Sequence, residues 1–218
     1  MKIKGIIFDM DGLIFDTEKL LMKFWIEASE FYGFKMKKEH VLGIRSLSAK
    51  LAAPKLHGIF GTDFDFEAVR NKRISLMNSY IAKNGIDKKC GIDELLQYLS
   101  KNKYKKAIAT STDYERTKMY LESSSLFNQF DEIICGPMVP NSKPAPDIYL
   151  KAAKALNLNP EDCMALEDSP NGITAAYSAG CIPIMIPDLS EPDEEIKGKL
   201  FTWKNSLLEI IPLLESLK

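Results

Sequence analysis

Two aspartates follow a short apolar run near the start of the chain. Residues 6–8 predict a fully buried strand, and Gly12 permits the tight turn that must come after it. Asp9 and Asp11 therefore belong at the carboxyl end of a central strand, the edge where open α/β sheets bind their ligands. Two carboxylates at that edge indicate a metal-assisted phosphoryl-transfer site.

The rest of the chain alternates β-prone apolar runs with helical patterns, which is typical of a parallel sheet covered by helices on both faces. The first two runs are separated by nearly a hundred residues, whereas the later ones follow at intervals that one crossover helix fills. We therefore predict an α/β fold with a segment inserted after the first strand. The expected strands are residues 3–8, 106–109, 132–135, 163–166 and 182–186.

The inserted segment, residues 17–82, is expected to be entirely helical. Asp16 or Thr17 can cap a first helix that Gly33 ends, and further helical stretches are expected from about 39 to 56 and from 66 to 82. Pro54 and residues 58–63 are expected to mark breaks. The predicted organisation is thus a core of residues 1–16 and 83–218 with a helical cap of residues 17–82.

The charge of the chain is unevenly divided. Residues 16–82 contain 11 Lys and Arg against 8 Asp and Glu, a net charge of +3 that leaves −4 for the remainder. A positive cap over an acidic core suits an anionic substrate, although a solvated helix face explains the same count. The net charge of −1 for the whole chain gives no reason to expect nucleic acid as a partner. No apolar run approaches the ~18 residues of a membrane-spanning helix, so we expect no membrane partner either.

The cysteines and histidines carry little chemistry in this sequence. The four cysteines are widely spaced and form no CxxC pair, and no secretory signal precedes the first strand, so we interpret them as reduced thiols of a cytoplasmic protein. The two histidines, His40 and His57, lie far from each other and from any cysteine pair. This spacing argues against a zinc site built on imidazole or thiolate ligands.

A phosphate ester is dianionic and repels carboxylates, so a site built from aspartates needs a cation, and Mg²⁺ brings carboxylates, water and phosphate oxygens together. Asp9 could then attack phosphorus as a nucleophile, while Asp11 protonates the leaving oxygen and later deprotonates water. Ordinary turn chemistry also explains an Asp-x-Asp-Gly segment. A calcium loop fits less well, because its glycine stands at position six and its glutamate at twelve, whereas Gly12 is fourth and position 20 is Leu.

Three later segments strengthen the prediction of a phosphate site. Thr110, Ser111 and Thr112 follow the second strand, where hydroxyls and amides at a helix start bind phosphate, although a plain N-cap uses the same residue types. Lys143 lies after the third strand in a loop whose prolines limit where its ammonium can go, although a lone lysine is usually solvated. Glu167 and Asp168 directly follow the fourth strand. Paired acids also favour a helix N-terminus, but their place at the edge shared with the two N-terminal aspartates makes them candidate metal ligands.

Four segments, in this order along nearly the whole chain, resemble the four motifs of the haloacid dehalogenase (HAD) superfamily. They are residues 9–18 (DMDGLIFDTE), 110–111 (TS), 142–147 (SKPAPD) and 167–176 (EDSPNGITAA). The sequence is most similar to the branch that contains β-phosphoglucomutases and phosphatases of sugar phosphates or nucleoside phosphates. The resemblance implies a Rossmann-like parallel sheet core with an inserted helical cap, dependence on Mg²⁺ and an aspartyl-phosphate intermediate.

The resemblance also implies a role for each residue of these motifs. The implied roles are nucleophile for Asp9, acid/base for Asp11, phosphate binding for Thr110, Ser111 and Lys143, and metal binding for Asp9, the Asp11 carbonyl and Asp168, with Glu167 supporting the metal.

The sequence departs from the β-phosphoglucomutases at two positions. Those enzymes pair the first motif with a downstream histidine that helps gate the acid/base, and the matching residue here is Leu21. They also place an arginine in the cap where this chain has Ser46, with Arg45 one step earlier. Both differences disfavour a mutase, and Glu18 is common among the phosphatases. A dehalogenase is disfavoured because those enzymes need neither the second aspartate of the first motif nor Mg²⁺.

We therefore expect a Mg²⁺-dependent phosphatase that hydrolyses a small phosphomonoester, either a sugar phosphate or a nucleotide-related compound. A phosphomutase is the first alternative, and a catalytically silent protein that binds a phosphorylated ligand is the second. The cap is expected to supply substrate contacts, for which Arg45 and Lys72 are candidates, although each can equally be an ordinary exposed cation. The expected partner is a small phosphorylated metabolite, bound by a monomer whose cap closes over the site.

Overall fold

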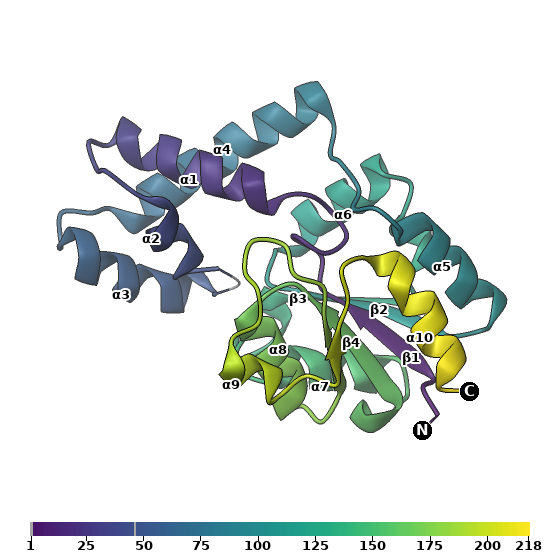
Figure 1. The fold of residues 1–218 in the computed structure, drawn as a ribbon. Coiled ribbons are helices and arrows are strands. Elements are labelled where there is room, and N and C mark those ends of the chain that lie inside the picture. The colour runs from purple at the N-terminus through teal and green to yellow at the C-terminus, as the bar shows by residue number, and fades with distance from the viewer. Residues whose placement is uncertain (1, 46) are drawn as a thin grey trace.

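The computed structural model describes residues 2–45 and 47–218. Within these residues a six-stranded sheet, in the order β3-β2-β1-β4-β5-β6, forms the centre of the molecule (Figure 1). All neighbouring strands pair in parallel. The strands are β1 (Gly5–Phe8), β2 (Lys105–Thr110), β3 (Glu132–Cys135), β4 (Cys163–Glu167), β5 (Ile182–Met185) and β6 (Thr202–Trp203).

The five predicted strands are all present, and their bounds agree with the prediction to within two residues. β2 extends to Thr110, so this threonine is the last residue of the strand and does not follow it. The sequence analysis missed β6, because a strand of two residues is too short to show the alternation of apolar and polar side chains.

Helices cover both faces of the sheet, as expected for parallel strands. Ile6 and Phe8 of β1 pack in one apolar cluster with α5, α6 and α10, whereas Ile7 packs in another with α7 and α8. The core helices are α5 (Ile92–Lys101), α6 (Tyr114–Ser123), α7 (Asp147–Ala155), α8 (Pro170–Ser178), α9 (Glu194–Lys197) and α10 (Ile210–Ser216), with short 3₁₀ turns η1 (Phe127–Gln129), η2 (Gly136–Met138), η3 (Pro160–Asp162) and η4 (Leu207–Glu209). None of the helices in the described residues is both long and apolar enough to cross a membrane.

Four further helices lie between β1 and β2 in the chain and form a separate group beside the sheet (Figure 1). They are α1 (Glu18–Phe31), α2 (Lys38–Leu42), α3 (Ala49–Phe60) and α4 (Phe66–Asn84). These helices enclose an apolar cluster of their own that includes Trp25, Leu56 and Phe64. Phe24 of α1 and Met77 of α4 pack instead on the large cluster of the core.

In the middle of this four-helix group, the helix boundaries differ from the prediction. The stretch 39–56 is not one helix, because α2 ends at Leu42 and α3 begins only at Ala49. Pro54 marks no break and lies inside α3, where burial of neighbouring apolar side chains offsets the backbone hydrogen bond that proline cannot make. The helix continues to Phe60 and stops at Gly61, whose φ of 86° favours glycine. At the end of α1 the prediction is confirmed, because Gly33 follows with a φ of 83°.

The two connections between the four-helix group and the core run beside each other. The Asp16 N–H donates to the Asp87 carbonyl at 2.9 Å, and the Lys89 N–H donates to the Ile14 carbonyl at 2.8 Å. Phe15 also pairs with Lys88 in an antiparallel bridge. The two connections are therefore joined to each other by backbone hydrogen bonds.

Candidate active site

The carboxyl ends of β1 and β4 bring three of the predicted site residues together. The register pairs Phe8 with Leu166, so the acids that follow these residues emerge at the same level of the sheet. One carboxylate oxygen from each of Asp9, Glu167 and Asp168 lies within 4.8 Å of the other two, and all three side chains are buried.

Lys143 is held between two of these acids. Its ammonium donates to Asp9 Oδ1 at 2.5 Å, to Glu167 Oε1 at 2.5 Å and to the Ala109 carbonyl at 2.9 Å, which uses all three of its protons. The side chain is buried, and burial alone lowers the pKa of Lys143, but the two carboxylates outweigh burial and raise it. The lysine therefore stays charged at neutral pH and fixes the orientation of Asp9.

Glu167 is already saturated with hydrogen bonds from the protein. In addition to Lys143, its Oε1 accepts from the Tyr149 hydroxyl at 2.6 Å, and its Oε2 accepts from the Asp168 N–H and the Ser169 hydroxyl, both at 3.2 Å. A Cβ at Gly172 would lie about 2 Å from this carboxylate, so the motif needs glycine there. This environment suits Glu167 to position Lys143, whereas direct ligation of a cation would cost it hydrogen bonds.

Asp9 and Asp168 have the features of a divalent cation site. Oδ1 of Asp168 is buried and has no hydrogen-bond partner among the described residues. Burial raises the pKa of both aspartates, and Lys143 and Arg45 only oppose this. A cation such as Mg²⁺ takes carboxylate oxygens as ligands and would satisfy the free oxygen and stabilise both charges. Gly12 allows the close approach, because a Cβ there would lie 2.1 Å from Asp168 Oδ2.

Asp11 lies outside that cluster with its carboxylate held by two threonines. The Thr17 hydroxyl donates to Oδ1 at 2.8 Å and the Thr112 hydroxyl donates to Oδ2 at 2.7 Å. Thr17 is the N-cap residue of α1, yet its side chain makes no capping bond and serves Asp11 instead. Thr110 Oγ1 in turn accepts from the Thr112 N–H at 3.1 Å. The sequence analysis missed this role of the two threonines, because their common partner is apparent only in the fold.

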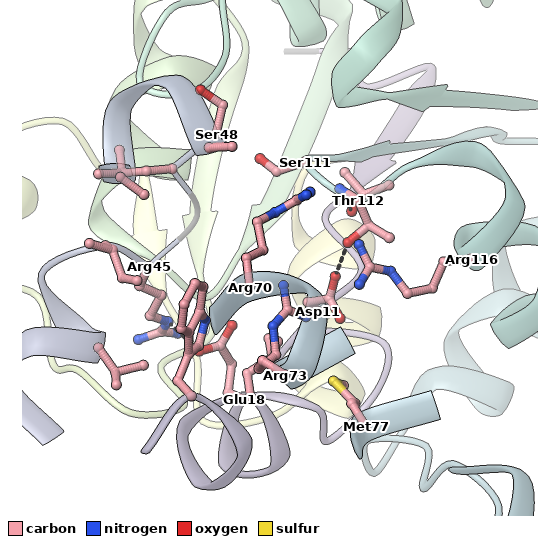
Figure 2. Close-up of a pocket in the computed structure, with 18 of the residues that line it drawn as sticks. Asp11, Glu18, Arg45, Ser48, Arg70, Arg73, Met77, Ser111, Thr112 and Arg116 are labelled. Carbon is pink, nitrogen blue, oxygen red and sulfur yellow. Dashed lines mark hydrogen bonds and ion pairs between the residues drawn. The ribbon is translucent and has the colours of Figure 1, made fainter. Parts of the chain in front are cut away.

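A cavity of about 140 Å³ lies over Asp9 and Asp11, between the sheet edge and the four-helix group (Figure 2). Thr110, Ser111 and Thr112 line its core side. Its other wall is mostly apolar and comes from α1, α2, α3, α4 and the chain between α2 and α3. The cavity also contains four arginines, Arg45, Arg70, Arg73 and Arg116.

Comparison with known proteins assigns the family. The model of the family described as haloacid dehalogenase-like hydrolase matches residues 6–186. The chain belongs to this family. The match confirms the resemblance carried by the four motifs.

Individual relatives of this hydrolase agree with the assignment. A probable pseudouridine-5'-phosphatase from Drosophila melanogaster is 33% identical over 199 residues, which cover 86% of this chain and 83% of that protein. A phosphorylated carbohydrates phosphatase from Thermotoga maritima is 30% identical over 178 residues, which cover 82% of each. The crystal structure of a hydrolase from Pseudomonas syringae has a TM-score of 0.86 at 22% identity, over 98% of this chain and 99% of that one. That likeness confirms the α/β fold.

Of the two cap residues predicted to contact substrate, the structure of this hydrolase places one in the site. Arg45 is buried, ion-pairs with Glu18 at 3.1 Å and with Asp168, and donates to the Asp168 carbonyl at 3.0 Å. Lys72 is not among the residues that line the cavity, and its ammonium lies 4.3 Å from the centre of the Phe31 ring, which is largely exposed. Ser46, which the mutase comparison used, lies outside the described residues.

Glu18 is the buried acid on the cap side of this hydrolase's site. Burial raises the pKa of Glu18 to about 8, although Arg45 opposes the shift. The sequence analysis noted Glu18 only as a family marker. It did not identify the other three cavity arginines. For Arg70 and Arg73 the available signal was the excess of basic residues in the insert and their spacing within one predicted helix, whereas Arg116 lies outside the insert and had no such signal.

Proposed function

We propose that this hydrolase is a Mg²⁺-dependent phosphatase that cleaves a small phosphomonoester through an aspartyl-phosphate on Asp9. The observation that carries the proposal is the fixed carboxylate of Asp9, whose Oδ1 accepts from Lys143 at 2.5 Å beside the buried, unpartnered oxygen of Asp168. Asp11 follows two residues later with both oxygens oriented by hydroxyls. The names of the two relatives, both phosphatases, support the same reaction.

In the proposed mechanism, the Asp9 carboxylate attacks phosphorus and the bond from phosphorus to the leaving oxygen breaks. Asp11 gives its proton to that oxygen. Asp11 then takes a proton from water, and the oxygen of that water attacks the phosphorus, which releases inorganic phosphate and restores Asp9. Thr110 and Ser111 hold the phosphate oxygens throughout, and the positive charge of Lys143, whose protons go to Asp9, Glu167 and the Ala109 carbonyl, stabilises the phosphate beside them.

Mg²⁺ is part of this proposal, with Asp9, Asp168 and the Asp11 carbonyl as its ligands and Glu167 supporting it through the hydrogen-bond network. When bound, the cation neutralises charge on the phosphate so that a carboxylate can approach it. The residues of the chain fit this role because Asp168 Oδ1 is otherwise unsatisfied.

We further propose that residues 17–82 act as a cap domain on a catalytic core of residues 1–16 and 83–218. Phe24 and Met77 pack on the apolar cluster of the core, and polar contacts also join the two at the cavity: the Ser142 hydroxyl donates to Ser48 Oγ at 2.8 Å, and the Asn171 side chain donates to the Arg45 carbonyl at 2.9 Å. Such contacts can break and re-form with water, which suits a cap that opens for substrate and closes to exclude solvent.

The mutase alternative requires the phosphoryl group of Asp9 to return to a substrate hydroxyl and not to pass to water. Leu21 lines the cavity at the position where the mutases have their gating histidine, and an apolar side chain there offers no proton donor. This observation favours the phosphatase.

The proposal is tested by assaying the purified chain with Mg²⁺ against a panel of phosphorylated sugars and nucleosides that includes pseudouridine 5'-phosphate. We expect release of inorganic phosphate that disappears in the Asp9→Asn variant and in EDTA. Conversion of β-glucose 1-phosphate to glucose 6-phosphate without free phosphate would instead establish a mutase. Binding of panel members without any turnover would establish a silent binding protein.

A further inference from the structure

The cavity contains more positive charge than the proposed reaction uses. Arg45 is occupied by Glu18 and Asp168. Arg70 and Arg116 each pair with an acid three residues earlier in the chain, Arg70 with Glu67 at 3.8 Å and Arg116 with Asp113 at 2.9 Å. Arg73 has no such partner.

Arg73 is a buried guanidinium that forms no ion pair within the described residues. The residue is 6% exposed, and its Nε has no hydrogen-bond partner in the described part of the chain. Its guanidinium carbon lies 5.3 Å from the centre of the Trp25 ring, and no hydrogen bond or ion pair is recorded for it among the described residues. The pKa of Arg73 is lowered to about 9, first by burial and then by the neighbouring charges of Arg116 and Arg70, and the charge of Asp11 opposes this only in part. A cation that is buried without a counter-charge is costly unless something pairs with it.

The position of Arg73 relates it to the substrate. Arg73 on α4 and Arg116 on α6 lie on either side of Asp11, the proposed acid (Figure 2). An acid that protonates a leaving oxygen must face the leaving group. The two arginines therefore border the part of the cavity that holds the organic portion of the substrate.

We infer that Arg73 and Arg116, with Arg70 beside them, form a second anion-binding site that takes a carboxylate or phosphate group on the organic portion of the substrate. This inference rests on the proposed function and specifies its substrate class. The substrates would be phosphate monoesters whose organic portion carries a second acidic group. Guanidinium groups suit both anions, because their donors match the oxygens of a carboxylate or a phosphate in pairs. The alternative is that Arg73 only stacks on Trp25 or only balances the charge of Asp11.

The test uses matched pairs of phosphate esters with Mg²⁺. One pair is 2-phosphoglycolate and ethyl phosphate, which differ by a carboxylate, and the other is fructose 1,6-bisphosphate and fructose 6-phosphate, which differ by a phosphate. We expect kcat/KM to be about 10- to 100-fold higher for the doubly anionic member of at least one pair, as a charged hydrogen-bonded contact implies. The pair with the larger ratio identifies the second group.

The Arg73→Met variant should remove that preference, mainly by raising KM for the doubly anionic ester, and should leave the singly anionic ester within about threefold. Arg116→Met should act in the same direction, and it replaces Arg73→Met if that variant does not fold. The matched control is Lys83→Met, which removes one exposed charge from the same helix and should leave the preference intact. An equal loss on both esters of a pair would show a structural or charge-balancing role and overturn the inference.

A binding measurement separates this inference from the proposed function. Calorimetry with the Asp9→Asn variant and the same esters needs no turnover, so it applies even if the wild-type chain releases no phosphate. Tighter binding of a doubly anionic ester that Arg73→Met abolishes supports the second site. Equal affinity for both members of each pair overturns it, whatever the reaction proves to be.

Discussion

Charge is arranged differently at the two sides of the cavity. We call the sheet edge with Asp9, Lys143, Glu167 and Asp168 the floor, and the side formed by the four-helix group the wall. On the floor, Lys143 lies between Asp9 and Glu167, with every ammonium proton used. In the wall, Arg73 is also buried but forms no ion pair among the described residues, and the charge of Asp11 offsets its own only in part. A group of charges held by fixed hydrogen bonds is oriented before substrate arrives, whereas a buried charge without an ion-pair partner gains most from a ligand of opposite sign. The floor thus suits chemistry shared by many substrates, and the wall suits the choice among them.

The largest effect on activity is expected when Asp9, the proposed nucleophile on the floor, is replaced. Asn keeps the shape of the side chain but is not a nucleophile, so Asp9→Asn should lower phosphate release by on the order of a thousandfold or more. Circular dichroism should show an unchanged fold. The control is Asp63→Asn, an exposed aspartate of the cap whose loss should leave the rate unchanged. Near-normal release by folded Asp9→Asn would exclude an aspartyl-phosphate mechanism.

The next largest effect concerns the cation at the floor. EDTA should abolish activity and added Mg²⁺ should restore it, because the carboxylates otherwise repel the phosphate. Asp168→Ala removes the unpartnered buried oxygen and should raise the Mg²⁺ concentration needed for half-maximal activity by more than about tenfold. Thermal shift titrations with Mg²⁺ provide a second readout that does not depend on turnover. Full activity in excess chelator would refute the metal requirement.

A smaller effect on activity should follow when one of the two hydrogen bonds that orient the Asp11 carboxylate is removed. Thr112→Val deletes the hydroxyl that donates to Asp11 Oδ2 and leaves Thr17, among the described residues, as the one hydroxyl recorded on this carboxylate. We expect kcat to fall about tenfold with little change in KM, because the acid is misoriented while the binding contacts stay. Steady-state kinetics measure both constants, and Thr62→Val, at an exposed position in the cap, is the control. A change confined to KM would place Thr112 in substrate binding.

At Glu18, where the floor and the wall meet, we expect the smallest effect on catalysis. The effect on stability should still be measurable. Its pKa is about 8 in the fold against 4.5 ordinarily, so between these values the folded state binds a proton that the unfolded state releases. The corresponding stability is fully present below 4.5 and is lost as the pH rises through 8, at most about 1.4 kcal/mol per pH unit. Glu18→Gln removes this dependence.

Urea unfolding at pH 5 and pH 8 tests the point when the change in the free energy of unfolding between the two pH values is compared for the wild-type chain and Glu18→Gln. The wild-type chain should lose more free energy of unfolding between these pH values than Glu18→Gln does. Parallel losses would show that Glu18 is ionised throughout.

More residues of the floor than of the wall could be predicted from the sequence, and the reason is physical. Asp9, Lys143 and Asp168 each follow a predicted strand, and in a parallel sheet the ends of the strands meet at one edge, so order along the chain is enough to bring them together. Arg73 and Arg116 lie on α4 and α6, and helical periodicity shows which residues share a face of a helix but not which other helix that face meets. Pro54 shows the same limit, because tertiary packing overrides its local preference to end a helix.

The paired connections at Asp16 and Asp87 bear on how such an enzyme can diversify. Because the two backbones are already bonded at 2.9 Å, the segment between them starts and finishes at one point on the core, and a short turn could close the gap. The order and register of the strands do not depend on how many residues the chain places there. A descendant could therefore exchange the whole segment, arginines included, and acquire a new range of substrates while it inherits Asp9 and Lys143 unchanged.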